Sequence, residues 1–296
     1  YSVLLYIMQM KHITKISDLT SLKIDELITS AFEYKRKYEL GIRQENKLDG
    51  KVIALVFEKP SLRTKVSFEV ATTYLQGTPV FLSSEQIFAS GNNQKGRESI
   101  PDIGRNLERF VDLIVARVYS HETISSLSSA VKVPVVNALC DMHHPTQALA
   151  DYMTLCWHFK DPKKIRVSYV GDGNNVATSL IQICAMMGVS ISVGSPKGYE
   201  IPIQEQKIAI ESAKKSGSSI NFFNTAEEAV EDADVVYTDT FVSMGQESQK
   251  EEKGKIFIPY QVNSHLMKKA KINTLFMHCL PAHRGEEVTD EVMDSK

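Results

Sequence analysis

Short β-branched runs alternate with helical patterns along most of this 296-residue chain, and no other feature constrains the fold as strongly. Gly, Pro, Asn or Asp marks each switch between the two patterns. Such alternation is typical of βαβ units, in which helices bury both faces of a parallel sheet. Strands are predicted at Val52–Phe57, Leu113–Ala116, Val133–Asn137, Arg166–Val170, Val189–Val193, Val235–Thr238 and Leu275–His278. The predicted fold class is therefore α/β with mostly parallel sheets.

Composition narrows the class of protein further. The chain is 43% hydrophobic and 24% charged, which is ordinary for a globular protein long enough for two domains. Its net charge of −2 predicts no general attraction to nucleic acid or to an anionic membrane. The four cysteines form no Cys-x-x-Cys pair, which argues against a zinc ribbon, a redox pair or a disulfide scaffold and favours a reducing cytoplasm. The apolar opening, residues 1–8, is too short to span a bilayer.

The turn between the strand Val52–Phe57 and the next helix has the composition of an anion site. Apolar residues recur at helical spacing after Lys65, so the helix must begin near Ser61. A helix start offers unpaired N–H groups and a partial positive charge, and Arg63 adds a fork of donors that suits phosphate. In the alternative interpretation, Ser61 and Thr64 only cap the helix. On this turn alone the two interpretations carry equal weight.

Further polar residues follow other predicted strands, where open α/β sheets bind their ligands. Arg117 comes directly after the strand Leu113–Ala116, although it could also be an ordinary surface arginine. His144 and Gln147 lie in the first turn of a helix that Pro145 opens, so both side chains can donate to one oxygen outside the helix start. The alternative for His144 is a simple helix start.

The second half of the chain suggests a dinucleotide site only weakly. Gly171 and Gly173 follow a strand, but Val176 stands where the fingerprint needs its third glycine. Asn174 and Asn175 suit a small zwitterion better, unless they merely form a turn. Cys279 follows His278 directly, and because adjacent strand residues point to opposite faces, the two cannot form a Cys–His nucleophile.

Taken together, these motifs resemble those of the aspartate/ornithine carbamoyltransferase family, from about Met10 to Met293. Ser61-Leu62-Arg63-Thr64 resembles the family's carbamoyl-phosphate loop. Arg117 and His144-Pro-Thr-Gln147 resemble its carbonyl-binding groups.

Two further segments resemble the ornithine branch of that family. Asp239 with Ser243-Met244-Gly245 resembles its ornithine loop, and His278-Cys279-Leu280-Pro281 stands where the aspartate branch has a His-Pro-Gly-Pro run. Putrescine enzymes share the Cys-Leu-Pro run but lack the Ser-Met-Gly segment, so that segment favours ornithine.

The resemblance implies two doubly wound α/β domains with the active site in the cleft between them. Residues 10–147 would bind carbamoyl phosphate and residues 148–296 ornithine, in a homotrimer or a multiple of trimers. Gln94 or Asn93, in the polar loop Ser83–Ser99, would enter a neighbouring subunit's site. The family's final helix would lie beyond Lys296, so we expect the natural protein to continue past that residue.

The resemblance also assigns roles to individual residues of this sequence. The residues expected to bind carbamoyl phosphate are Ser61, Leu62, Arg63, Thr64, Gln94, Arg117, His144, Gln147, Cys279 and Leu280. The residues expected to be catalytic are Arg63, Arg117, His144, Asp239 and Cys279. The residues expected to bind ornithine are Asn175, Asp239, Ser243 and Met244. No metal and no cofactor is expected.

The predicted activity is transfer of the carbamoyl group of carbamoyl phosphate to the side-chain amine of L-ornithine, which gives citrulline and phosphate in cytoplasmic arginine metabolism. A sister carbamoyltransferase that uses putrescine or acetylornithine is an alternative. A nicotinamide-dependent dehydrogenase and a catalytically silent metabolite-binding protein are the alternatives from other classes.

Overall fold

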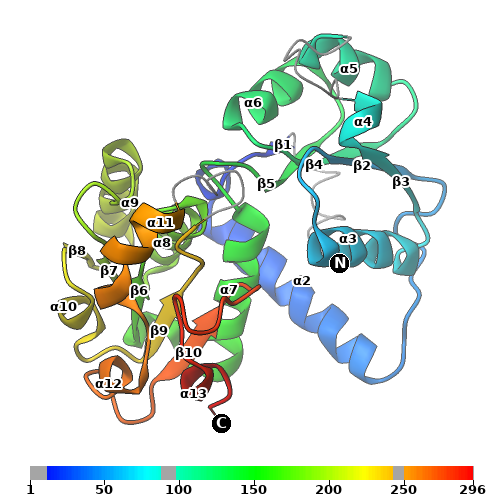
Figure 1. Ribbon diagram of the computed structural model, residues 1–296. Coiled ribbons are helices and arrows are strands. Elements are labelled where there is room, and N and C mark those ends of the chain that lie inside the picture. The colour runs from blue at the N-terminus through cyan, green and yellow to red at the C-terminus, as the bar shows by residue number, and fades with distance from the viewer. Residues whose placement is uncertain (1–11, 88–97, 243–249, 296) are drawn as a thin grey trace. The chain divides into compact units, whose positions relative to one another are not determined.

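The computed structural model describes residues 12–87, 98–242 and 250–295 of the chain. The chain divides into two compact units, and the division falls between Leu149 and Ala150. Each unit holds a five-stranded sheet in which all neighbouring strands are parallel (Figure 1). The predicted α/β class with parallel sheets is confirmed.

The sheet of the first unit has the strand order β1-β5-β4-β2-β3. Its strands are β1 (His12–Ile13), β2 (Val52–Phe57), β3 (Thr78–Ser83), β4 (Leu113–Arg117) and β5 (Val135–Leu139). Its helices are η1 (Ile16–Asp18), α2 (Ser21–Glu39), α3 (Leu62–Tyr74), α4 (Ser84–Ile87), α5 (Ile100–Leu107), α6 (His121–Ala130) and the start of α7 (Pro145–His158). After β2 the chain first adds β3 on one side and then β4 on the other. The order therefore reverses between β2 and β4, which is where an open α/β sheet places a ligand.

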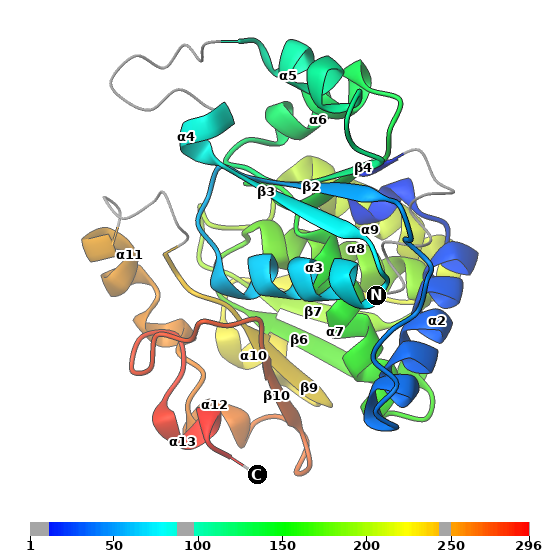
Figure 2. The same ribbon diagram turned by 90° about the vertical axis from the view of Figure 1, so that its right-hand side faces the viewer.

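Helices lie on both faces of this sheet, with α5 and α6 on one and α3 on the other (Figure 2). Ile124 and Leu127 of α6 belong to one buried cluster with Ala54 of β2 and Ile114 of β4. Full burial of a side chain such as leucine or isoleucine contributes about 1.5–3 kcal/mol. This packing fixes β4, which ends at Arg117, and β2, which leads to the start of α3 and Thr64.

The sheet of the second unit has the order β10-β9-β6-β7-β8. Its strands are β6 (Arg166–Val170), β7 (Ser190–Gly194), β8 (Ile220–Phe223), β9 (Val235–Thr238) and β10 (Leu275–His278). The remaining helices are η2 (Pro162–Lys164), α8 (Asn175–Met187), α9 (Ile203–Ser216), α10 (Ala226–Val230), α11 (Lys250–Ile256), η4 (Ile258–Tyr260), α12 (Ser264–Met267) and α13 (Asp290–Met293). Here the order reverses between β6 and β9.

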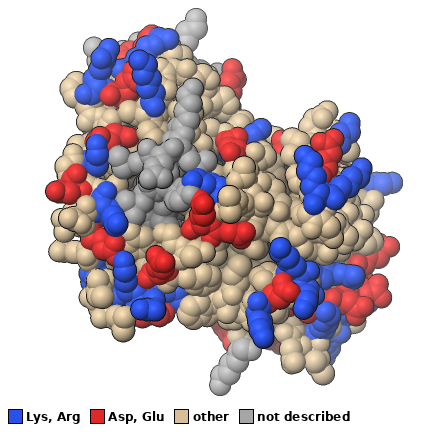
Figure 3. Space-filling view, turned by 180° about the vertical axis from the view of Figure 1, so that it is seen from behind, with Lys and Arg blue, Asp and Glu red and all other residues tan. Residues whose placement is uncertain are grey.

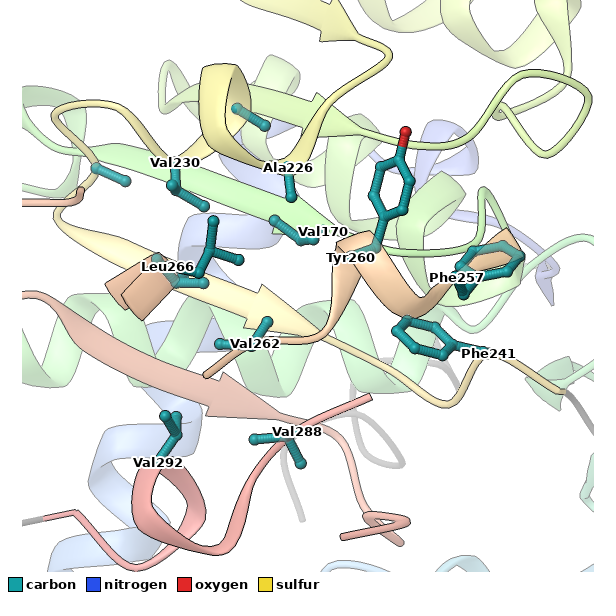
Figure 4. Packing of buried hydrophobic residues seen from close by; sticks show 13 residues of the cluster. Val170, Ala226, Val230, Phe241, Phe257, Tyr260, Val262, Leu266, Val288 and Val292 are labelled. Atoms are coloured by element: carbon teal, nitrogen blue, oxygen red, sulfur yellow. The ribbon is translucent and has the colours of Figure 1, made fainter. Parts of the chain in front are cut away.

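One face of the second sheet is covered by a buried cluster that joins α10, η4, α12 and α13 to β6 and β9 (Figure 4). Within it the rings of Phe241 and Phe257 lie 4.7 Å apart between centroids. Phe241 comes shortly after β9, so this contact holds the chain just beyond the end of that strand. Helix α8 is buried on nearly every side, as expected for a helix that is apolar all round.

Several predicted strands need correction. The run predicted at Val133–Asn137 forms β5 two residues later, because Pro134 has no N–H to donate to the sheet. β7 begins at Ser190 and ends at Gly194, one residue later than predicted, and Arg117 is the last residue of β4 rather than the residue after it.

Three strands were not predicted at all, and each lies at the edge of a sheet. They are β1, β3 and β8. An edge strand is covered less completely than a central one, so β3 and β8 contain no fully buried residue and lack a continuous apolar run.

The length and polarity of the segment Gly245–Lys255 predict a binding loop from the sequence, but the structure is helical from Lys250 onward as α11. Glu251 and Glu252 lie in the first turn of this helix and Lys253 and Lys255 in its last turn, a distribution that complements the helix dipole. The polarity of this segment therefore belongs to a short helix, in which Lys253 is buried.

Basic and acidic side chains lie next to one another over much of the face that Figure 3 shows, in keeping with the small net charge. Within the described ranges, no helix is both long enough and apolar enough to cross a membrane.

Gly173 is required by a close approach between two loops of the second unit. A Cβ at this position would lie 2.2 Å from the Ile201 nitrogen and 2.3 Å from the Glu200 carbonyl carbon. Gly173→Ala should therefore lower the free energy of unfolding by about 1–3 kcal/mol, measured by denaturant titration. In the control Gly254→Ala, the new methyl group meets nothing within 4 Å, so stability should hold or rise. Equal stability of Gly173→Ala and the wild type would contradict the close approach.

Candidate functional site

The first group of predicted site residues gathers where the strand order of the first unit reverses. Ser61 caps helix α3, and its Oγ accepts a hydrogen bond of 3.3 Å from the Thr64 N–H. From the end of β4, Arg117 Nη1 donates to Thr64 Oγ1 at 3.4 Å. The structure thus joins two of the predicted motifs across the β2–β4 boundary, and we call Ser61, Arg63, Thr64, Arg117 and His144 the Arg117 cluster. Leu62 is the first residue of α3, and its side chain is 77% exposed.

Arg117 is a buried cation that lacks an ionic partner in the described part of the chain. Only 5% of its surface is exposed, and its Nε has no hydrogen-bond partner. Burial, and secondarily the nearby Arg63, lower its pKa to about 10. Among the described residues, no carboxylate forms an ion pair with it. Burial and the charge of Arg117 also lower the pKa of Lys59, which lies 4.5 Å from the Tyr119 ring centroid. An anion bound here would relieve this excess of positive charge.

His144 is a neutral imidazole within this positive environment. Burial and the nearby Arg117 lower its pKa to about 3. Its Nδ1 lies 3.3 Å from Thr146 Oγ1. In the tautomer in which Thr146 donates to Nδ1, Nε2 carries the hydrogen and is the nitrogen that can donate. Gln147 follows in the same first turn of α7, as predicted, with its backbone N–H donating to the His144 carbonyl at 3.1 Å.

The second group gathers where the strand order of the second unit reverses. Asp239 follows β9 and is 7% exposed. Its Oδ1 accepts a hydrogen bond of 2.9 Å from Cys279 Sγ, and its Oδ2 accepts one of 2.8 Å from Asn174 Nδ2. Asn174, Asp239 and Cys279 form what we call the Asp239 cluster. Both donors are neutral, so within the described part of the chain this buried carboxylate has no cationic partner either.

Cys279 acts in this cluster as a hydrogen-bond donor. Burial and the Asp239 carboxylate raise the pKa of its thiol well above the ordinary value. A thiol that stays protonated is a poor nucleophile. His278 turns away from it and contacts Glu287 instead, with Nε2 3.2 Å from Oε1. The structure therefore contains no Cys–His pair at this position, as the alternation of side chains predicted.

The sequence named Asn174 beside Asn175 as suited to a small zwitterion or to a turn, but it did not predict the double role that Asn174 has in the structure. Its Oδ1 accepts from the N–H groups of Val176 and Ala177 and caps α8, while its Nδ2 binds Asp239. An asparagine directly before an apolar helix is a recognisable N-cap. The bond to Asp239, by contrast, joins residues 65 positions apart and leaves no local trace. Asn175, which was singled out, is the first residue of α8 and is half-buried.

The Gly171-Asp-Gly173 turn serves the protein's own packing. Gly173 approaches the backbone of Glu200 and Ile201, and its N–H donates to the Tyr199 carbonyl at 2.8 Å. Asp172 forms a buried ion pair of 2.6 Å with Lys253. Packing within the second unit therefore explains the glycine at position 173, and no dinucleotide site is needed to account for it.

Four predicted residues lie outside the described ranges. They are Asn93, Gln94, Ser243 and Met244.

Two groups of side chains have possible metal-ligand atoms within 4.8 Å of one another: Asp239 with His278 and Cys279, and His283 with Glu286 and Glu287. In the first group the thiol is protonated and already donates to Asp239, which does not suit a metal ligand. In the second group Glu287 already accepts from His278 and from the His283 N–H. Both groups are explained by hydrogen bonding alone.

Comparison with known proteins places the chain in a class. Residues 11–156 match the carbamoyl-P binding domain of aspartate/ornithine carbamoyltransferase, and residues 163–296 match the Asp/Orn binding domain of the same family. The chain therefore belongs to the aspartate/ornithine carbamoyltransferase family and has the two domains of a carbamoyltransferase.

Within that family, its relatives carry the name of the ornithine branch. The chain is 46% identical over 281 residues to "Ornithine carbamoyltransferase, anabolic" of Pyrococcus furiosus, covering 95% of this chain and 87% of the relative. It is 43% identical over 285 residues to ornithine carbamoyltransferase of Bacillus subtilis, covering 96% and 86%.

Solved structures agree with this placement. The fold matches ornithine carbamoyltransferase from Pyrococcus furiosus with a TM-score of 0.90 at 45% identity, covering 95% of this chain and 88% of that one. An N-acetyl-L-ornithine transcarbamylase mutant matches with a TM-score of 0.83 at 27% identity, covering 95% and 91%. The sister enzyme thus shares the fold at a much lower identity.

The double role of Asn174 can be separated by substitution. Asn174→Ser keeps a capping oxygen but removes the donor to Asp239, which should cost about 1.5–3 kcal/mol of unfolding free energy. Asn174→Ala removes the cap as well and should cost about 0.5–2 kcal/mol more. The control Asn263→Ser alters another asparagine cap, on α12, whose side-chain oxygen accepts from the His265 and Leu266 N–H groups. Denaturant unfolding in which Asn174→Ser costs no more than Asn263→Ser would refute the role of the Asp239 bond.

The first unit should lose stability in mild acid. Burial lowers the pKa of His143 to about 3, with a smaller contribution from His121, whereas an unfolded histidine titrates near 6.5. A depressed folded pKa stabilises the protein above pH 6.5, and this stabilisation is lost as the pH falls toward 3. The loss should approach 1.4 kcal/mol per pH unit as an upper limit.

His143→Phe should reduce the slope of unfolding free energy between pH 7 and pH 5, and the exposed control His158→Gln should leave it unchanged. Equal slopes in the wild type and in His143→Phe would show that His143 does not contribute to this acid sensitivity.

Proposed function

We propose that this protein is an ornithine carbamoyltransferase, which transfers the carbamoyl group of carbamoyl phosphate to the side-chain amine of L-ornithine and releases phosphate and L-citrulline. The observation that carries the proposal is the buried Arg117, which has no ionic partner among the described residues and bonds to Thr64 at the start of α3. The names of its relatives supply the amine substrate.

Carbamoyl phosphate would bind through the first unit. The start of α3 offers backbone N–H groups and the positive end of a 13-residue helix. Ser61 and Thr64 add hydroxyls, and the exposed Arg63 adds a guanidinium. The phosphoryl end would occupy this helix start, where its charge offsets those of Arg63, Lys59 and Arg117.

The carbonyl end would be polarised by Arg117, His144, Thr64 and Gln147. When the amine attacks, the carbonyl oxygen becomes an oxyanion, and donors aimed at that oxygen stabilise it more than they stabilise the starting carbonyl. Because His144 is neutral, it donates one hydrogen bond and adds no further charge to a site that already holds three cations. We assign Arg117 and His144 the largest contributions.

Ornithine would bind through the second unit. The buried Asp239 carboxylate would accept hydrogen bonds from the side-chain amine of ornithine. These bonds would hold the lone pair of the amine nitrogen toward the carbonyl carbon. Cys279, as a protonated thiol, keeps the Asp239 carboxylate in place. Asn175, with Ser243 and Met244, would bind the α-amino and α-carboxyl groups, while Leu280 would contact carbamoyl phosphate. Gln94 would come from a neighbouring subunit.

The reaction balances without a metal or a cofactor. The amine nitrogen forms a bond to the carbonyl carbon, the bond between that carbon and the phosphate oxygen breaks, and the proton lost by the nitrogen goes to the departing phosphate.

We also propose a cytoplasmic homotrimer, or a multiple of trimers, that acts in arginine metabolism. One relative is named anabolic and another, from Thermoplasma volcanium at 44% identity, is named catabolic.

The activity is tested by incubating the protein with carbamoyl phosphate and, separately, ornithine, putrescine, acetylornithine or aspartate. We expect a carbamoylated product from ornithine alone. A product from putrescine or acetylornithine instead would indicate a sister enzyme. Absence of any product together with tight NAD binding would indicate a dehydrogenase, and either result would reject the proposal.

Arg117→Gln should separate activity from stability. Losing one oxyanion donor should lower kcat/KM about 10²–10³-fold, as in other acyl-transfer sites. Because the lost charge is buried without an ionic partner, the melting temperature should stay the same or rise. In the exposed control Arg109→Gln, both quantities should match the wild type. Full activity of Arg117→Gln, or a loss of activity that merely follows unfolding, would contradict the role assigned to Arg117.

A further inference from the structure

A single buried carboxylate fastens both ends of the turn that carries Cys279 and Leu280. Glu287 is 0% exposed. Its Oε1 lies 3.2 Å from His278 Nε2, at the start of the turn, and accepts a hydrogen bond of 2.5 Å from the His283 N–H, at the end of the turn. One oxygen atom therefore sets the distance between the two ends.

His278 extends this connection into the turn itself. Its Nδ1 accepts a hydrogen bond of 2.8 Å from the Leu280 N–H. Because Nδ1 is an acceptor, the ring hydrogen of the neutral imidazole lies on Nε2 and is donated to Glu287. The tautomer of His278 is thus fixed from both sides. Leu280 has a positive φ of 60°, so the turn adopts a conformation that its own sequence disfavours.

The backbone of Glu287 is held by the buried core of the second unit. Its carbonyl accepts a hydrogen bond of 2.8 Å from the Val262 N–H, and the adjacent Val288 lies in the buried cluster of the second unit (Figure 4). A displacement of the turn must therefore break a bond to Glu287 rather than move Glu287 along with it.

Stability alone does not explain a carboxylate at this position. Glu287 Oε2 has no hydrogen-bond partner, and the nearest basic nitrogen in its ion pair with His283 is 3.8 Å away. An apolar side chain of similar size would avoid the cost of burying this charge. What an apolar side chain cannot do is accept the two hydrogen bonds that hold His278 and His283.

We propose that Glu287 is a positioning residue for the reaction. Through His278 and the His283 N–H, it sets the positions of Leu280 and of the Cys279 thiol that donates to Asp239. The catalytic part of this inference rests on the proposed ornithine carbamoyltransferase activity, whereas the geometric part does not.

The test compares three variants of the full chain. Glu287→Met fills the same space but accepts no hydrogen bond, and Glu287→Gln keeps an acceptor oxygen. Glu205→Met is the matched control, because Glu205 is also a buried glutamate of the second unit and accepts a hydrogen bond of 2.5 Å from Gln182, between α8 and α9. Each variant is measured for melting temperature, for kcat and KM, and for the rate of Cys279 alkylation by iodoacetamide, read by peptide mass spectrometry.

In Glu287→Met, we expect Cys279 to be alkylated faster and kcat/KM to fall, by up to about 10²-fold if the turn moves by about 1 Å. Glu287→Gln should resemble the wild type in both measurements. Glu205→Met should lower the melting temperature without changing either. If Glu287→Met fails to fold, His278→Gln, which removes the same link from its other end, should show the faster alkylation.

Wild-type alkylation and turnover in folded Glu287→Met would overturn the inference, and so would the same changes in Glu205→Met. If Glu287→Gln also showed faster Cys279 alkylation and a lower kcat/KM, the negative charge of Glu287 rather than its acceptor oxygen would be what positions the turn. That result would also overturn the inference. If the wild type makes no citrulline, the proposed function fails, and the alkylation rates alone then decide whether Glu287 positions the turn.

Discussion

In each of the two units, a buried charge lies where the strand order reverses and finds no ionic partner among the described residues, and the proposed chemistry depends on these two charges, Arg117 and Asp239. Among the described residues, the Arg117 side chain bonds to the neutral Thr64 hydroxyl alone, and the Asp239 carboxylate accepts only from the neutral side chains of Asn174 and Cys279. Burial of an unpaired charge is costly unless a ligand compensates it. The first unit is therefore built to receive an anion and the second to receive N–H donors, which are the properties of the two substrates proposed for it.

The parallel sheets explain why these charges stand where they do. In each sheet the strand order reverses once beside the central strands, between β2 and β4 in the first unit and between β6 and β9 in the second. At such a point the two following segments turn to opposite faces and leave the strand ends open. Thr64 and Arg117 meet across one reversal, and Asn174 and Asp239 meet across the other. Helix caps at Ser61 and Asn174 then stabilise the same segments that carry the polar groups.

Sequence patterns predicted the parts of this arrangement that depend on local chemistry. The apolar runs of the central strands and the start of α3 at Ser61 follow from burial and capping, and both were located to within two residues. The edge strands β3 and β8 escaped notice because they lack a fully buried run. The bond of Asn174 to Asp239 and the role of Glu287 were missed for another reason: their partners, Asp239 and His278, become neighbours only in the folded chain.

A crystal structure of the protein with bound carbamoyl phosphate would test the central claim most directly. If Arg117 and the start of α3 bind this substrate, its phosphoryl oxygens should lie at the start of α3, within about 2.7–3.2 Å of donors from Ser61 and Thr64. Its carbonyl oxygen should lie within the same distance of Arg117 or His144. A ligand that binds elsewhere, or that leaves Arg117 without a contact, would contradict the central claim.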